Sequence, residues 1–514
     1  MPPLLDRGRG GGLAAVAGLT LIQGIAAGAA AFATRDIFEA LQRGSGPPAA
    51  GLVLLVGAGA VIAASRIGAR LLGERLGQDY ARQIRGALFE HAARMPAGAV
   101  ARRRAGHVSL RFVGDMTAFR NWLGLGLPRL VAGAVMIPAT LLVMWLLQPA
   151  LAAVVAPVLG ATMLLAGLGG LPLVRLQRRL RTLRARIAAD MAERMPIAPQ
   201  LDRLGRRGTE MTLLERRSDA MIDAALRHRI VAETLKALPD LAAGIAAALI
   251  LLAGHRQGIG TASIAAALAL LGLTLAPLRD LGGVWNHRAA HAAAARKAQA
   301  AMARRGRDLY RAGKPLCKVP AEVVLEDVAL PSGRSLSWSV PAGARGWLPV
   351  DELDGEAVVE MLLGLDSPER GRILLSGTDL RDLSRGALRR GVLRIGAAPE
   401  ILHGSLRRAL LMGCRDRPDD AGLSRLACDE GLAPLIARLG GLDCTVREAG
   451  RNLTRGERIA VALVRMRLLR PRLILVDGDC AAEAWPRIER HLTACPATVI
   501  CARPEAESAR LVAA

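Results

Sequence analysis

Long runs of uncharged residues occur only in the part of this 514-residue chain that precedes Arg279. A bilayer core needs about 20 apolar residues per helix, so the 45-residue run is long enough for two spans, with a turn at Gln148-Pro149. The shortest run becomes a span if its helix starts at Lys236 and that side chain reaches toward the interface. We therefore expect six membrane-spanning helices. The runs are 10–34, 44–65, 130–174, 241–254 and 257–278.

The connections between these runs differ in length and charge. Arg35–Arg43 is short, whereas Arg66–Arg129 carries 12 arginines against 4 acids and Arg175–Asp240 carries 15 basic residues against 9 acids. Cytoplasmic loops of membrane proteins are enriched in Lys and Arg, so we expect both long connections, the N-terminus and the C-terminal domain to be cytoplasmic. The long connections have helical patterns, for example Leu176–Met195, which would extend the helices beyond the bilayer.

The composition favours membrane lipids over nucleic acids as partners. The formal net charge is +24, but aromatic residues make up only 3% and no basic patch is interleaved with them. Single-stranded nucleic acids are usually bound by basic grooves with stacking aromatics. We therefore attribute the charge to cytoplasmic loops and to contact with anionic lipids, with no nucleic acid bound.

Cysteine usage bounds the compartment of the second half. All seven cysteines lie between Cys317 and Cys501, with no CxxC pair and no histidines at metal-binding spacing. This pattern indicates a reducing, cytosolic domain and no disulfide framework, and we assign no metal ligands.

From Val319 the pattern changes to short β-type runs between Gly and Pro turns, alternating with helical segments. This alternation predicts an α/β domain with a partly parallel sheet. We therefore expect a membrane domain over residues 1–300, a linker over 301–318 and an α/β domain over 319–514. The clearest strand candidates are Val323–Leu325, Gly371–Leu375 and Thr498–Ile500.

One motif identifies the family that the chain resembles. The sequence Leu453-Thr454-Arg455-Gly456-Glu457-Arg458 is followed nineteen residues later by Asp477, which ends the apolar run Leu473–Val476. This spacing resembles the signature helix and Walker B strand of ABC transporters. The resemblance covers nearly the whole chain and implies a type I exporter-like half-transporter, with an all-α six-helix transmembrane domain followed by a degenerate P-loop NTPase-type domain. Gly106–Phe112, with Asp115 and Arg120, resembles the first coupling segment.

The positions that resemble the P-loop lack its chemistry. A P-loop, GxxxxGK[ST], uses glycines to wrap phosphates, a Lys to neutralise them and a hydroxyl to hold Mg²⁺. The matching positions are Asp354, Gly355, Glu356 and Ala357, with Gly355 at the Lys and Glu356 at the hydroxyl. The preceding loop 349–353 has no glycine and adds two carboxylates. At about 4 Å, each contact with a phosphate should cost a few kcal/mol, so this site should repel a triphosphate.

The other positions of the family's catalytic site are similarly altered, so we assign no catalytic residue. Ala397 replaces the metal-positioning Gln, Gly478 replaces the catalytic glutamate, and no histidine follows His491. No Tyr or Phe follows Tyr310 to stack on an adenine. We expect Asp477, as the Walker B remnant, to be a strand-end residue more than a Mg²⁺ ligand, because one carboxylate is a poor site for this ion.

The signature residues can act on a nucleotide in another subunit. The resemblance implies that such domains dimerise head to tail, so that each signature closes on the ATP held by its partner. Thr454 keeps a hydroxyl, Gly456 keeps a close-approach glycine, and Arg455 either crowds the phosphate or adds a cation. The alternative is a helix cap without a ligand. The candidate residues are Leu453, Thr454, Arg455, Gly456 and Glu457.

The resemblance therefore implies a membrane subunit that pairs with an ATP-competent half-transporter, which binds the ATP and Mg²⁺. A homodimer would have two altered sites and no energy source. Two alternatives are a non-transporting regulatory membrane protein with an ABC-like interaction domain, and an ordinary ATP-driven exporter. The spans contain few polar residues besides Gln23, which favours an amphipathic or lipid-like substrate.

Overall fold

A computed structural model of the chain divides it into two compact units, each of which is described here by itself. The first comprises Met1–Ala93 and Arg103–Arg304, and the second comprises Arg94–Arg102 and Arg305–Ala514. The residues that the structure describes are 1–4, 6–101, 115–304, 306–316, 320–396, 400–414, 417–478, 481–492 and 496–502.

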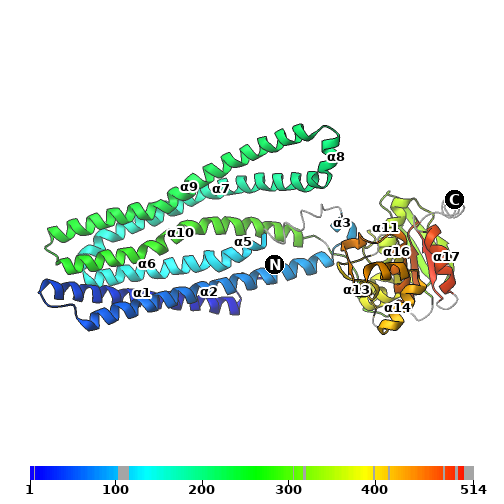
Figure 1. Ribbon diagram of the computed structural model, residues 1–514, viewed down its shortest axis with the longest axis horizontal. Helices are drawn as coiled ribbons and strands as arrows, with labels where there is room; N and C mark the ends of the chain where they lie inside the picture. Colours follow the sequence, from blue (N-terminus) through cyan, green and yellow to red (C-terminus); the bar gives the residue numbers. More distant parts are fainter. Residues whose placement is uncertain are drawn as a thin grey trace. The chain divides into compact units, whose positions relative to one another are not determined.

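The first unit is entirely helical where the structure describes it. It contains six helices, or continuous helical segments, that are long and apolar enough to cross a membrane, which confirms the predicted number (Figure 1). Their bounds are α1 (Arg7–Gln42), α2 (Ala49–Ala93), α5 (Met116–Asn121) continuing through η2 (Trp122–Gly126) into α6 (Leu127–Leu147), α7 (Pro149–Arg194), α9 (Arg207–Arg256) and α10 (Thr261–Met302).

The predicted turn between the third and fourth spans is also present. Gln148 is extended, with φ −160° and ψ 102°, and α7 starts at Pro149. Proline suits this first helical position because its missing N–H would have no partner there. The charged connections continue the helices, as their pattern predicts. In Figure 1, α7 and α9 run side by side and are joined at one end through η3 (Met195–Ile197) and α8 (Ala198–Arg203).

The bundle interior is largely apolar, and its buried threonine hydroxyls donate to backbone carbonyls one turn earlier. The Oγ1 of Thr274 donates to the carbonyl of Leu270 at 2.9 Å and lies 3.2 Å from the Oγ1 of Thr140. Large apolar side chains also cover the outside of the helices, for example Val53, Leu146 and Leu164. Such an exterior suits a lipid environment, because the apolar side chains there face lipid tails and not water.

The second unit is an α/β domain with two four-stranded sheets and one short two-stranded sheet in its described residues. One sheet is antiparallel, in the order β2-β1-β4-β5, and the other is parallel, in the order β3-β10-β9-β6. The three predicted strand segments are confirmed. The strands are β1 (Val323–Ala329), β2 (Ser335–Val340), β3 (Arg345–Trp347), β4 (Arg372–Leu375), β5 (Thr378–Asp379), β6 (Val392–Ile395), β7 (Gly404–Ser405), β8 (Thr445–Val446), β9 (Leu473–Val476) and β10 (Thr498–Cys501).

The helices of the second unit lie around these sheets. Three of them, α13, α14 and α15, share a separate apolar cluster with α16. The segment Arg94–Arg102, which includes α3 (Ala97–Ala101), also belongs to this unit. The backbone N–H of Ala97 donates to the carbonyl of Leu365 at 2.9 Å, and that of Arg307 donates to the carbonyl of Arg94 at 2.7 Å. The helices are α11 (Glu352–Leu362), α12 (Arg385–Gly391), α13 (Leu406–Leu410), α14 (Asp420–Asp429), α15 (Ala433–Leu439), α16 (Arg455–Leu469) and α17 (Ala481–Leu492), with short turns η4 (Leu380–Asp382) and η5 (Glu448–Gly450).

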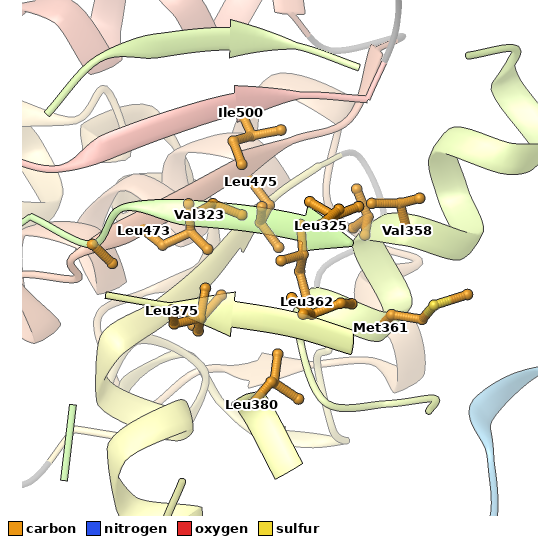
Figure 2. Close-up of a cluster of buried hydrophobic side chains, with 14 of the residues drawn as sticks. Val323, Leu325, Val358, Met361, Leu362, Leu375, Leu380, Leu473, Leu475 and Ile500 are labelled. Atoms are coloured by element: carbon orange, nitrogen blue, oxygen red, sulfur yellow. The ribbon is translucent and has the colours of Figure 1, made fainter. Parts of the chain in front are cut away.

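A buried apolar cluster joins α11 to both four-stranded sheets (Figure 2). Val358 and Leu362 of α11 pack with side chains from β1, β4, β9 and β10, and both are fully buried. This cluster fixes the position of α11, whose N-terminal residues are those that resemble the P-loop. The labelled side chains of Figure 2 are Val323, Leu325, Val358, Met361, Leu362, Leu375, Leu380, Leu473, Leu475 and Ile500.

We predict that Leu362→Ala lowers the free energy of unfolding of the second unit by about 2–5 kcal/mol, because it opens a cavity in this cluster. Leu353 lies on the same helix but is 69% exposed, so Leu353→Ala should change stability by less than about 0.5 kcal/mol. Denaturant unfolding of the full chain in detergent, followed by tryptophan fluorescence, compares the two variants. Equal effects would contradict the assignment of this core.

Candidate functional site

The segment that resembles the P-loop forms the first turn of α11. The helix starts at Glu352, three residues before Gly355, and Asp351 is its N-cap. The Asp351 Oδ1 accepts the backbone N–H of Asp354 at 2.9 Å. Helix N-termini bind anions through unpaired N–H groups and the helix dipole. Here a carboxylate of the chain itself takes that role.

The neighbouring carboxylate of Asp354 is fully buried and has several partners. It accepts the Ser332 backbone N–H at 3.1 Å and the Ser332 hydroxyl at 2.6 Å. Arg334 lies 3.5 Å from Asp354 and 3.2 Å from Asp351. Two of the acids at this position are therefore compensated within the chain, which weakens the simple expectation of repulsion between bare carboxylates and a phosphate.

Gly355, at the position of the P-loop lysine, has no room for a side chain. A Cβ atom added there would overlap the backbone carbonyl oxygen of Ala502, which follows β10. Because this neighbour is backbone, the overlap can be relieved only by moving α11 or the strand end. The close packing therefore excludes a simple lysine at this position.

Arg394, on β6, connects the P-loop-like segment to the Walker B-like strand. Its Nε donates to the Asp477 Oδ1 at 2.7 Å, and its Nη2 donates to the Glu356 Oε1 at 2.8 Å. We name this arrangement the Glu356–Arg394–Asp477 bridge. Burial disfavours the charged guanidinium, but hydrogen bonds and attraction from Asp477 and Glu356 outweigh it, so the pKa of Arg394 is raised above its ordinary value. The arginine therefore stays charged at any physiological pH.

Asp477 follows β9 and is 7% exposed. Its backbone N–H donates to the carbonyl of Ile395 at 3.0 Å, which holds it beside the end of β6. A Cβ atom at Gly396 would overlap the Asp477 carboxylate, so the glycine provides the space that the carboxylate occupies. Asp477 thus lies directly after the end of β9 and is also one end of the bridge. A Mg²⁺ ion bound to its Oδ1 would have to displace the guanidinium.

The signature-like residues form the N-terminus of α16. The Thr454 Oγ1 accepts the backbone N–H of Glu457 at 3.2 Å, and the Glu457 Oε2 accepts that of Thr454 at 2.7 Å. This reciprocal pair is a capping box, so Thr454 has the role of a helix cap. A hydroxyl that accepts one hydrogen bond can still donate its proton, so the cap does not exclude a ligand. Leu453 is buried in the apolar cluster that α16 forms with α13, α14 and α15.

Glu457 is held by a further cation. Arg438, on α15, donates from its Nη2 to the two carboxylate oxygens of Glu457 at 2.9 and 3.0 Å. Burial would raise the pKa of Glu457, but hydrogen bonds from the Thr454 backbone and from Arg438 outweigh it, so the pKa lies below its ordinary value. The start of α16 is therefore tied to α15 by an ion pair.

Several predicted positions lie outside the described residues. These are Ala397, the coupling-like segment Gly106–Phe112, and the region after Ala502, where the family's histidine would lie. Asp115 and Arg120 are described, and lie 3.7 Å from Lys297 and 3.9 Å from Glu74 respectively. The structure thus brings Asp354, Gly355, Glu356 and Asp477 together, and places the Thr454 region on a separate helix of the same unit.

Sequence reasoning missed the cations of this site. Arg394 carries the bridge, Arg334 and Ser332 satisfy the acids at the start of α11, and Arg438 holds Glu457. The available signal for Arg394 was a single charge in the otherwise apolar strand Val392-Leu393-Arg394-Ile395, directly before the position of Ala397. A charge there needs a partner at the strand end.

The family profile described as the ABC transporter transmembrane region matches residues 13–274, just over half of the chain. The chain belongs to the ABC transporter transmembrane family. Curated relatives of this ABC transporter chain support the assignment. A multidrug efflux ATP-binding/permease protein of Mycobacterium bovis is 25% identical over 257 residues, which cover 47% of this chain and 21% of the relative.

A mycobactin import ATP-binding/permease protein of Mycobacterium bovis is 32% identical over 160 residues, which cover 30% of this chain and 26% of the relative. The chain therefore spans only about a fifth to a quarter of the length of these curated ABC transporters. Their names include both efflux and import. Family membership therefore leaves the direction of transport open.

The fold agrees with the family. A solved structure of a bacterial Atm1-family ABC exporter with ATP bound superposes with a TM-score of 0.79 at 19% identity, covering 95% of this chain and 90% of the exporter. The fold of the ABC transporter chain, six membrane-capable helices followed by an α/β domain, is thus the fold of that exporter, as the resemblance implied.

We predict that Arg394→Gln lowers the free energy of unfolding by about 1–3 kcal/mol, because it leaves the largely buried Asp477 without its cation. Arg394→Lys should restore part of this loss. Arg390→Gln is the matched control, because Arg390 is exposed at the end of the preceding helix α12. The measurement is denaturant unfolding at neutral pH, and an Arg394→Gln variant as stable as the control would contradict the bridge.

The Glu457–Arg438 pair predicts a pH dependence. Since the folded pKa of Glu457 is lowered, its stabilisation is complete above the ordinary carboxyl value of about 4.3 and is lost as pH falls through the folded pKa. Glu457→Gln should therefore be less stable than the wild type at pH 7 by about 0.5–1 kcal/mol. The difference should shrink below pH ~4. Thermal unfolding across this range measures it, and a difference that grows in acid would contradict the assignment.

Proposed function

We propose that this chain is the membrane subunit of an ABC-type transporter whose own nucleotide site does not turn over ATP, and that it pairs with an ATP-competent half-transporter. The observation that carries the proposal is the Glu356–Arg394–Asp477 bridge. It joins the two positions at which the family would hold Mg²⁺ with an arginine of the same chain.

The residues present do not fit MgATP. A Mg²⁺ ion in such a site needs several well-placed oxygen ligands, and it is bound through carboxylates together with substrate phosphates. At the Asp477 Oδ1 the ion would have to displace a bound guanidinium, and a cation–cation contact with Arg394 would be unfavourable in a partly buried site. Glu356 is also engaged by this arginine, because its Oε1 accepts a hydrogen bond from the Nη2 of Arg394.

A triphosphate would meet a second obstacle at α11. The helix N-terminus is capped by Asp351, the loop has no wrapping glycines, and the lysine position cannot carry a side chain without moving the end of β10. A phosphate at this end of the helix would compete with the Asp351 carboxylate for the Asp354 N–H, whereas an intact P-loop offers free N–H groups.

The need for at least one intact ATP site as the energy source implies pairing with an active partner. Two copies of this chain would bring together two sites of the same altered kind, whereas a heterodimer supplies one intact site. In that arrangement the Thr454–Gly456 end of α16 faces the partner's ATP, and the partner holds the ATP and Mg²⁺. Half-transporters of this family generally function as dimers, which supports an assembly of two chains.

An exposed apolar surface supports a protein partner. Met195, Ile197 and Leu204 lie around α8, at the end of the α7–α9 pair, and all three are exposed. They lie outside the uncharged runs, in the highly charged connection 175–240, so a bilayer does not explain them. Clustered exposed apolar side chains outside a membrane commonly mark protein contacts.

We place the chain in a membrane with both the N-terminus and the α/β domain in the cytoplasm, in a bacterial case the inner membrane. The positive charge of both long connections supports this orientation. The proposed division is a membrane domain over about 1–300, a linker over 301–318 and an ABC-like domain over 319–514. A regulatory membrane protein and an autonomous ATP-driven exporter are the alternatives that the following tests exclude or support.

We predict that the purified full chain has no vanadate-sensitive ATPase activity and binds MgATP no more tightly than about 1 mM. Gly355→Lys alone should not restore binding, because the lysine lacks space and the bridge remains. Calorimetric titration and phosphate release measure both quantities. Micromolar binding or steady turnover by the wild-type chain would reject the proposal and favour an autonomous transporter.

The partner can be recovered from native membranes with a tagged chain in mild detergent, and should carry an intact GxxxxGK[ST] sequence. Failure to recover such a protein would favour the regulatory alternative.

In the reconstituted pair, Thr454→Asp should keep the helix cap but lower ATPase activity at least about tenfold, because it places a carboxylate against the partner's phosphate. Thr454→Ser should be nearly normal, and Thr445→Asp, at the exposed position of β8, is the charge control.

A further inference from the structure

An apolar cavity of about 430 Å³ lies within the helical unit, between η2, α6, α7, α9 and α10. This volume is in the range of small-molecule sites in proteins. Apart from the indole groups, its lining has two polar side chains, and the Thr162 hydroxyl already donates to the carbonyl of Val158 at 2.7 Å. The other is the guanidinium of Arg288. The lining residues used below are Trp122, Gly167, Leu278, Trp285 and Arg288.

The cavity extends from the apolar part of the bundle into its charged part. Leu278 is the last residue of the uncharged run on α10, and Arg288 follows ten residues later on the same helix. At 1.5 Å per residue, the two are about 15 Å apart along the helix axis. An occupant that fills the cavity therefore has one end among apolar side chains and the other beside a cation.

Arg288 is the cation that this cavity offers to a ligand. Among the described residues it forms no ion pair, whereas nearby acids on α9 and α10 are occupied. Asp240 pairs with Arg279, and Asp280 lies 3.4 Å from Arg129. The guanidinium carbon of Arg288 lies 5.6 Å from the centre of the Trp285 ring, a distance at which a cation is attracted to the ring face.

Both indole rings of the cavity are held in position by their neighbours. Trp285 packs against Gly170 of α7, where an added Cβ atom would overlap the ring. Trp122 stacks on His291, with the ring centres 5.9 Å apart. The aromatic end of the cavity is therefore preorganised beside the guanidinium of Arg288.

We propose that this cavity binds an amphipathic organic anion, with an apolar body along the spans and one anionic group on Arg288. This deepens the proposed function, on which it rests, by naming the substrate class of the membrane subunit. A cationic ligand would be repelled by Arg288, and a neutral apolar one would leave the guanidinium unused. A lipid chain that merely dissolves beside the helices, and a helix of the partner subunit, are the competing occupants.

The test uses the full chain in lipid nanodiscs without nucleotide, with dansylamino-undecanoate as the probe and its methyl ester as the neutral reference. Dansyl fluorescence excited through tryptophan reports binding, after subtraction of empty nanodiscs. The wild type should bind the carboxylate about tenfold more tightly than the ester, as expected for one charge-assisted hydrogen bond. Arg288→Gln should remove this preference, and Arg296→Gln, an exposed arginine eight residues further on α10, should keep it.

A steric pair of variants tests the cavity itself. A Cβ atom at Gly167 meets nothing within 4 Å, so Gly167→Leu should fill the cavity without disturbing the helix and weaken binding of both probes about tenfold or more. Gly160 is equally open but does not line the cavity, so Gly160→Leu should have no effect.

Three results would overturn the proposal: no binding by the wild type, a carboxylate preference that survives Arg288→Gln, or binding unaffected by Gly167→Leu. The last would mean that the probe lies in lipid or at another surface. Because the binding needs no ATP or partner, these results are independent of the ATPase and co-purification tests, and either proposal can fail alone.

Discussion

In the α/β unit, one guanidinium held between two carboxylates connects the P-loop-like helix to the ends of two parallel strands. Arg394 joins α11 to the ends of β6 and β9, the elements that carry the P-loop-like and Walker B-like residues. A ligand that binds only the folded state adds stability that grows with the logarithm of its concentration above the dissociation constant. The bridge connects the same elements through side chains of the chain itself.

The same principle applies at both helix ends that the family uses to bind phosphate. Asp351 caps α11, and Thr454 and Glu457 cap α16, so the chain satisfies its own N–H groups. The two ends differ in what they leave available. At α11 the cap is a carboxylate beside further acids, whereas at α16 the Thr454 hydroxyl keeps a proton to donate. This asymmetry is what a subunit would need if it assisted a partner's site without having an active one.

Much of the fold could be predicted because the length of an uncharged run and the spacing of apolar residues can be read within one short segment of sequence. Uncharged runs located the spans, and apolar runs between turns located β1, β4, β9 and β10. Arg394 could not be placed in the same way, because its partner depends on strand order. Parallel pairing sets Arg394 opposite Leu475 on β9 and so brings it near Asp477, a contact between residues far apart in sequence. Space at Gly355 likewise depends on Ala502, which lies at the end of a distant strand.

The assignment of Arg94–Arg102 to the second unit has a consequence for how the two halves of the chain depend on each other. Its backbone is hydrogen-bonded to Arg307 and Leu365, although it is encoded between two membrane helices. The polypeptide therefore enters the α/β unit twice, and a fragment that begins at residue 319 omits two stretches of that unit, 94–102 and 305–318. Because a segment encoded within the first half of the chain belongs to the second unit, a cut at the linker does not separate the two units completely.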